Sequence, residues 1–141
     1  LTMGEVDPEK PTLVRVHITD TLRDLLHANY PGSPRWPLHA AMRKVAEEGS
    51  GVIVLLNNGQ DSYALEERIR GFFEARSDGK PSSDSSGSSG VYLTVGTGSQ
   101  ILRELGVSRM RLMSAPIKFS GISGFDLEVV EYLPYDDGNN Q

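Results

Sequence analysis

The chain has no cysteine among its 141 residues, which excludes disulfide bonds and every thiolate metal site. No apolar run approaches the roughly 20 residues of a membrane span, and no signal peptide is evident. Acidic residues outnumber basic ones, and the net charge of −5 argues against a nucleic-acid or anionic-membrane surface. We therefore expect a cytoplasmic protein with enough chain to bury the core of one domain.

The chain also lacks an initiator methionine and opens on a sequence that resembles the middle of a strand, so we expect a piece of a larger protein. Ser77–Gly90 consists mainly of serine and glycine and predicts a flexible loop; an active-site lid is the alternative that this composition disfavours. The polar residues 136–141 predict a frayed tail. Residues 1–135 are expected to form a single domain.

Apolar patterning in the rest of the chain predicts strands that alternate with helices. The expected strands span residues 1–6, 12–18, 52–56, 109–113 and 127–133. Four helices are expected, beginning near Thr19–Thr21, at Leu38, at Asp61 and after Gly98. The second ends at Glu48 and the last at Gly106. In the third, the residues expected to point inward are Leu65, Ile69, Phe72 and Phe73. This order predicts an α/β (α+β) sandwich in which helices flank a mixed β-sheet.

One stretch, Thr94–Tyr132, resembles the C-terminal half of the GTP cyclohydrolase II family. The matching positions are Gly96, Gly98, Gln100–Arg103, Leu105–Val107, Met110–Leu112 and Leu127–Glu131, with weaker similarity at Leu13–His17 and Ala40–Val52. That family opens the imidazole ring of GTP in the first step of riboflavin synthesis. The resemblance implies the same sandwich fold, a turn at Gly96–Gly98 between a strand and a helix, and assembly as a homodimer.

The resemblance also implies where a catalytic zinc would bind, through three cysteines of the family. Asp20, Gly32 and Pro34 stand at those positions in this chain. Glycine and proline have no side-chain ligand, and a catalytic zinc needs three protein ligands and an open position for water. We therefore expect the zinc cofactor to be absent.

The catalytic and nucleotide-recognition positions of the family are altered as well. Val91 and Leu93 stand where the family has an aspartate and an arginine, and neither side chain can transfer a proton or contact a phosphate. Gly59 and Asp61 replace a glutamate and an arginine of the GTP-contacting turn, and a carboxylate there reverses the charge offered to a nucleotide. Asp61 is read more simply as a helix cap.

Some polar residues of the family pattern remain: Arg15, His17, Ser114 and Lys118. Arg15, Ser114 and Lys118 could still hold an anion weakly, so GTP binding is expected to be weak or absent. His17 and Asp20 could belong to a rebuilt metal site, with His27 and His39 on helices nearby in sequence. The ordinary interpretation, local hydrogen bonds and exposed helix faces, is favoured for all of these histidines. Arg109 and Arg111 are expected on a solvated strand face.

Because the fold signals persist while the metal, recognition and proton-transfer residues are lost together, the sequence predicts a degenerate GTP cyclohydrolase II-like domain. In bacteria such domains are often fused behind 3,4-dihydroxy-2-butanone 4-phosphate synthase, so the resemblance implies a covalent partner on the N-terminal side and a structural or regulatory role. Two alternatives remain open. One is an active GTP cyclohydrolase II with a rebuilt metal site, and the other is a nucleotide-binding regulatory module.

Overall fold

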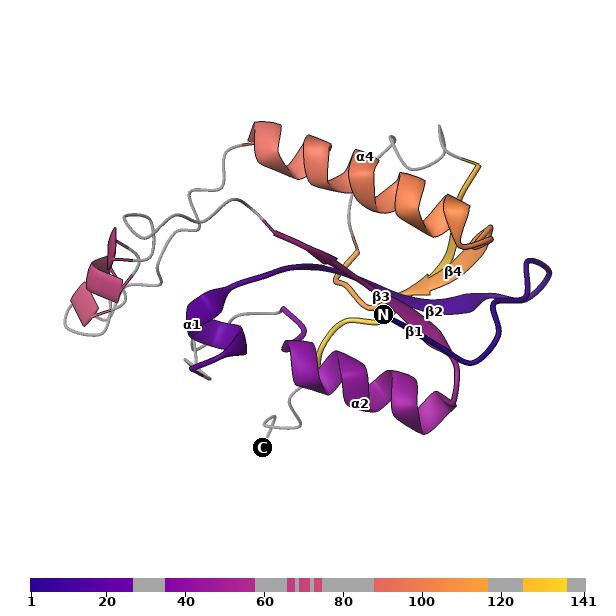
Figure 1. Ribbon diagram of the computed structural model, residues 1–141, viewed down its shortest axis with the longest axis horizontal. Helices are drawn as coiled ribbons and strands as arrows, with labels where there is room; N and C mark the ends of the chain where they lie inside the picture. Colours follow the sequence, from indigo (N-terminus) through magenta and orange to yellow (C-terminus); the bar gives the residue numbers. More distant parts are fainter. Residues whose placement is uncertain are drawn as a thin grey trace.

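The computed structural model describes residues 1–26, 35–57, 88–116 and 126–136, with residues 66–67, 69–71 and 73–74; for residues 88–95 it describes the backbone only. Helices lie on both sides of a central sheet (Figure 1). In chain order the labelled elements are β1 (Thr2–Met3), β2 (Thr12–Ile18), α1 (Thr21–Asp24), α2 (Leu38–Glu48), β3 (Gly51–Leu56), α4 (Ser88–Glu104), β4 (Arg109–Leu112) and β5 (Glu128–Tyr132).

The five described strands form one mixed sheet in the order β1-β3-β2-β4-β5. β1 runs antiparallel to β3, whereas β2, β3, β4 and β5 pair in parallel. From β2 the chain crosses to β3 on one side, and from β3 it crosses back over β2 to β4 on the other. Right-handed crossovers in opposite directions place their helices on opposite faces, as found for α2 and α4. The predicted mixed sheet with flanking helices is confirmed.

Each face of the sheet carries its own buried core, because successive residues of a strand point to opposite faces. Val14 and Leu13 on β2 illustrate this, since the first packs with residues of α4 and the second with residues of α2. The core on the α4 side comprises Val14, Val52, Val54, Leu102, Val107, Met110, Leu112 and Leu127. The core on the α2 side comprises Leu13, Ala41, Val45, Ile53 and Met113.

Helix α2 has the bounds that its sequence predicts, Leu38–Glu48. Ala41 and Val45 are buried against the sheet, as expected of residues four apart on one helix face. Gly49 ends the helix in the left-handed conformation, with φ of 77°. Trp36, just before the helix, donates from Nε1 to the Leu133 carbonyl at 2.7 Å and joins α2 to the chain after β5.

Helix α4 differs from the sequence prediction, because it begins at Ser88 and runs through Gly96 and Gly98. The predicted turn at Gly96–Gly98 is therefore wrong. A Cβ added to Gly98 would lie 3.1 Å from Cγ1 of Val16, so this glycine lets the helix approach the sheet closely. Residues 88–90 of the predicted flexible loop Ser77–Gly90 are helical; residues 77–87 lie outside the described part of the chain.

The C-terminus of α4 confirms the stop signal predicted at Gly106. Gly106 has a φ of 80°. Its N–H donates to the Arg103 carbonyl at 2.9 Å, and the N–H of Val107 donates to the Leu102 carbonyl at 3.0 Å. These two bonds form a Schellman motif, and the buried Leu102 and Val107 belong to one core.

The third predicted helix is described only in part. Helical residues occur between Glu66 and Glu74, whereas Asp61, Leu65 and Phe72 lie outside the described residues. Ile69 and Phe73 were expected to point inward, but they are 36% and 63% exposed. A helical spacing of apolar residues predicts which side chains share a face; it does not supply the surface that covers them.

At the opposite edge from β1, strand β5 contains a β-bulge. Met110 pairs with Val129 and Arg111 with Glu131, so Val130 is an extra residue with no partner on β4. Val130 is 37% exposed. No helix among the described residues is long and apolar enough to cross a membrane.

Candidate functional site

The candidate site lies at the carboxyl ends of β2 and β4. These neighbouring strands continue in opposite directions, β2 toward β3 and β4 toward β5, which makes the gap between them a topological switch point. In open α/β sheets, ligands bind outside the carboxyl ends of strands at such points. The polar side chains of β2 that face α2 are Arg15 and His17, and both lie toward this end of the strand.

Arg15 is held against the end of β4. Its Nη1 donates to the Met113 carbonyl at 2.8 Å, one residue before Ser114. The Ser114 hydroxyl donates to the Ala115 carbonyl at 2.9 Å. Burial lowers the pKa of Arg15 to about 10, with repulsion from Arg23 and Arg35 acting in the same direction. Lys118, the third predicted residue of the remnant, lies outside the described residues.

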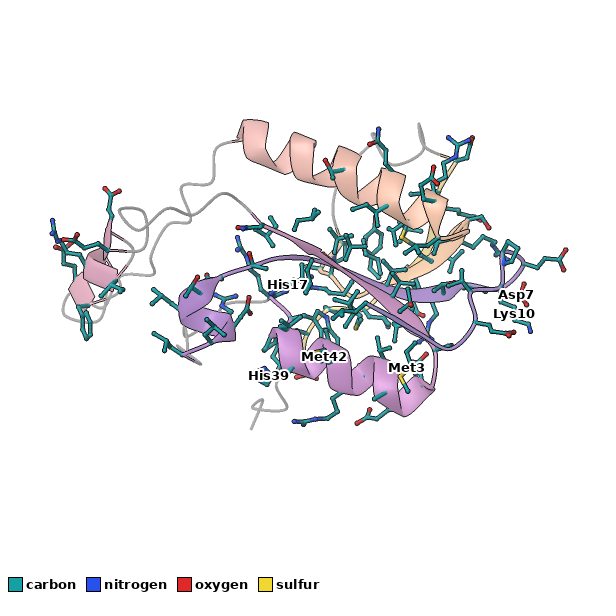
Figure 2. All side chains as sticks on the ribbon, viewed as in Figure 1. Met3, Asp7, Lys10, His17, His39 and Met42 are labelled. Atoms are coloured by element: carbon teal, nitrogen blue, oxygen red, sulfur yellow. The ribbon has the colours of Figure 1, made fainter. Side chains whose placement is uncertain are left out.

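His17 forms a buried pair with Asp24 of α1. His17 Nε2 lies 2.9 Å from Asp24 Oδ2, and the two side chains are only 4% and 9% exposed. The same Oδ2 atom accepts the backbone N–H of Asp20 at 2.8 Å. Figure 2 shows His17 on β2 close to α1. The sequence suggested Asp20 as the neighbour of His17, so its hydrogen-bond partner Asp24 was missed.

Asp20 has a different role, because its carboxylate caps α1. Its Oδ1 accepts the N–H groups of Leu22 and Arg23 at 3.1 and 3.3 Å. Asp20, which the sequence analysis expected at the first cysteine position of the family, therefore stabilises the start of a helix. Gly32 and Pro34, expected at the other two positions, lie outside the described residues, as do His27, Gly59 and Asp61.

Within the described ranges, no group of three or more histidine, aspartate or glutamate side chains could hold a metal ion. Three buried polar atoms at or beside the His17–Asp24 pair have no hydrogen-bond partner in the described part of the chain: Arg15 Nε, His17 Nδ1 and Asp24 Oδ1. The arrangement can therefore orient a buried imidazole and offer a donor and an acceptor to a small polar ligand. His39 lies on the exposed face of α2, as predicted.

Val91 and Leu93, which the sequence analysis matched to the family's catalytic aspartate and arginine, lie in the first turns of α4. This match was made by counting back from Gly96 without gaps, on the expectation that the segment precedes a turn. The structure places the whole segment in one helix, and the side chains at these positions are outside the described part.

Arg109 and Arg111 lie on the solvated face of β4, as the sequence predicts. Arg109 Nε contacts Glu128 Oε2 at 3.1 Å. Arg111 bridges two carboxylates, Glu131 at 2.8 Å and Glu48 of α2 at 2.7 Å. These ion pairs explain both arginines as structural residues of the surface.

We predict that the Glu48–Arg111 pair gives a pH-dependent part of the stability. Burial alone would raise the pKa of Glu48, but hydrogen bonding and attraction to Arg111 and Lys44 lower it below 4.5. Since its pKa is lower in the folded state, this group stabilises the fold at neutral pH and loses that effect as the pH falls through its folded pKa. Glu48→Gln should cost about 0.5 kcal/mol at pH 7 and nothing near pH 3 in urea unfolding. The exposed neighbour Glu47→Gln is the control, and a difference that persists at pH 3 contradicts the prediction.

Comparison with known proteins places the chain in a family. A sequence profile described as GTP cyclohydrolase II matches residues 1–134. The chain belongs to the GTP cyclohydrolase II family. It is 56% identical over 134 residues to a 3,4-dihydroxy-2-butanone 4-phosphate synthase of Pseudomonas aeruginosa, covering 95% of this chain and 34% of that protein. It is 37% identical over 144 residues to the riboflavin biosynthesis protein RibBA of Parabacteroides distasonis, covering 96% of this chain and 34% of the relative.

Among solved structures, the chain is similar to RibBX of A. baumannii, a two-domain 3,4-dihydroxy-2-butanone 4-phosphate synthase. The TM-score is 0.53 at 31% identity, covering 96% of this chain and 31% of that one. This GTP cyclohydrolase II-family chain thus spans about a third of the length of the relatives it matches. The family suggested by the sequence is confirmed, and so is the relation to proteins of riboflavin biosynthesis.

Proposed function

We propose that this chain is a non-catalytic domain of a riboflavin-biosynthesis protein and acts through structure or regulation. The observation that carries the proposal is the use of both carboxylates of the candidate site within the fold. Asp20 caps α1, while Asp24 holds His17 and the backbone of Asp20. A hydrolase that activates water needs ligands or a base directed at substrate, and these groups are directed at one another.

The residues at the family's functional positions support the same proposal. Gly32 and Pro34 have no side-chain ligand for zinc, and Val91 and Leu93 have no proton to give. In this proposal the domain carries no zinc and binds GTP weakly or not at all. Loss of catalytic groups with retention of the packed core is what a structural role requires.

We propose that its partner is a 3,4-dihydroxy-2-butanone 4-phosphate synthase domain, fused on the N-terminal side within a cytoplasmic homodimer. The names of the similar proteins support this choice, since relatives about three times as long are synthases. The domain would then support the assembly, stability or control of the synthase.

Two proteins test the proposal. One is the full two-domain protein that contains this domain, and the other is the same protein truncated just before Leu1. With zinc and GTP, the full two-domain protein should release no formate, because this domain lacks the groups that activate water. Removal of the domain should lower the melting temperature or change the oligomeric state of the synthase. Formate release that depends on His17 and is abolished by a chelator contradicts the proposal and favours a rebuilt hydrolase. Equal synthase activity, mass and melting temperature favour a domain on which nothing depends.

A second candidate is a regulatory module that binds an anionic metabolite. The buried Nε of Arg15, which has no partner among the described residues, favours it. Trp36 is the only tryptophan of the chain and follows Arg35, whose charge acts on Arg15. Titration of GTP and riboflavin-pathway metabolites against Trp36 fluorescence, in the native chain and in Arg15→Met, distinguishes the two functions. A saturable signal lost in Arg15→Met selects the regulatory module, and no signal up to millimolar ligand selects the structural domain.

A further inference from the structure

An exposed apolar surface lies between α2 and the edge strand β1. On α2, Glu48 pairs with Arg111 of β4 and lies 3.4 Å from Lys44, so these two residues occupy the flank that faces β4. At 100° per residue, Met42 lies on the opposite flank. Because β1 and β4 lie on opposite sides of β3 and β2, which α2 covers, Met42 faces β1.

Leu1 and Met3 reach this surface from the sheet. Met3 pairs with Gly51, and Leu1 exchanges two backbone hydrogen bonds with Ile53, of 2.8 and 2.9 Å. Residues paired across neighbouring strands point to the same face, and Ile53 belongs to the core on the α2 side. Leu1 and Met3 therefore lie on the face that α2 covers.

We call Leu1, Met3 and Met42 the β1–α2 patch. Met3 and Met42 are 45% and 48% exposed, which is high for large apolar side chains on one surface, and Leu1 lies beside them on the same face. Figure 2 shows Met42 near the middle of α2 and Met3 near its C-terminal end. A Cβ on Gly4 would lie 2.7 Å from the Gly49 carbonyl oxygen, which confirms that the end of β1 lies against the end of α2.

We propose that the β1–α2 patch docks the synthase domain, an inference that rests on the proposed function. Leu1 is itself part of the patch and is fixed to β3 by its backbone. In a protein with a domain before Leu1, the connecting chain therefore leaves from within the patch. A covalently attached domain is present there at a high effective concentration, so a small apolar surface suffices to hold it. Exposed methionines suit such a contact, because Met is enriched in the cores of protein interfaces.

The outer edge of β1 adds a polar component to this surface. β1 is the terminal strand of the described sheet, so its second edge pairs with no strand among the described residues. An extended segment of the synthase domain could extend the sheet there through backbone hydrogen bonds. The β1–α2 patch would then bury the apolar side chains beside that added strand.

Thiol accessibility in the full two-domain protein tests the docking, since this chain supplies no cysteine of its own. Met42→Cys probes the patch, and Ile101→Cys is the matched control on α4, with 37% exposure. Alkylation of each cysteine is followed by mass spectrometry of its peptide. Although Met42 is the more exposed of the two here, its cysteine should react about tenfold more slowly than the control, because modification requires solvent access. Equal rates overturn the proposal.

Dilution identifies the occupant. Protection by a covalently attached domain does not change when the protein is diluted about 100-fold, because that contact is intramolecular. Protection that fades on dilution assigns the patch to a second copy of the chain and overturns the proposal. The proposed function is refuted by separate assays: by formate release, or by a synthase whose activity, mass and melting temperature do not change when the domain is removed. Failure of the proposed function is therefore distinguishable from failure of the docking proposal.

Discussion

Replacing Asp24 by alanine should destabilise the chain by about 3 kcal/mol, because the change leaves two buried groups without their partner. His17 loses the carboxylate at 2.9 Å, and the N–H of Asp20 loses its acceptor at 2.8 Å. Both side chains of the pair are at least nine-tenths buried, so water does not replace the lost bonds. Urea unfolding followed by Trp36 fluorescence measures the loss.

The control for this change is Glu128→Ala, which removes an ion pair with Arg109 on the surface of the sheet. That pair is 65% and 46% exposed, so its removal should cost about 0.5 kcal/mol or less. If Asp24→Ala and Glu128→Ala cost the same, the buried pair does not hold α1 to β2. Asp24→Asn keeps the shape and one acceptor, and it should fall between the two.

Leu102→Ala should cost about 3 kcal/mol, because it opens a cavity between α4 and the sheet. Leu102 is 1% exposed and belongs to the core cluster that contains Val14 and Val54. Its neighbour Ile101 is 37% exposed, so Ile101→Ala should cost about 1 kcal/mol or less. Equal losses for the two variants would mean that α4 does not pack on the sheet through the face described.

The sequence predicted those elements whose signals are local. Leu38–Glu48 has an apolar face and ends at a glycine, and the structure returns the same bounds. Gly106 likewise marks the end of α4. The β2 strand at Thr12–Ile18 follows from its β-forming residues. In each case the residues that decide the structure lie within the element or next to it.

The sequence-based prediction failed where contacts between residues far apart in the chain determine the structure. Glycine and serine have low helix propensity, so Ser77–Gly90 predicts a loop and Gly96–Gly98 a turn. In the structure residues 88–98 are helical, and the helix packs closely on the sheet at Val16, 82 positions before Gly98, a contact that no local pattern encodes. The partner of His17 was missed for a related reason. Asp24 is seven residues away, across a strand end and a helix start, and no periodic pattern connects the two.

The bulge at Val130 has a consequence for the behaviour of the chain at high concentration. A flat edge strand with a free row of backbone donors and acceptors is a template onto which strands of other molecules add, which leads to fibrils. The extra residue in β5 breaks that row and increases the local twist. The β5 edge is therefore protected against aggregation, and deletion of Val130 would remove that protection.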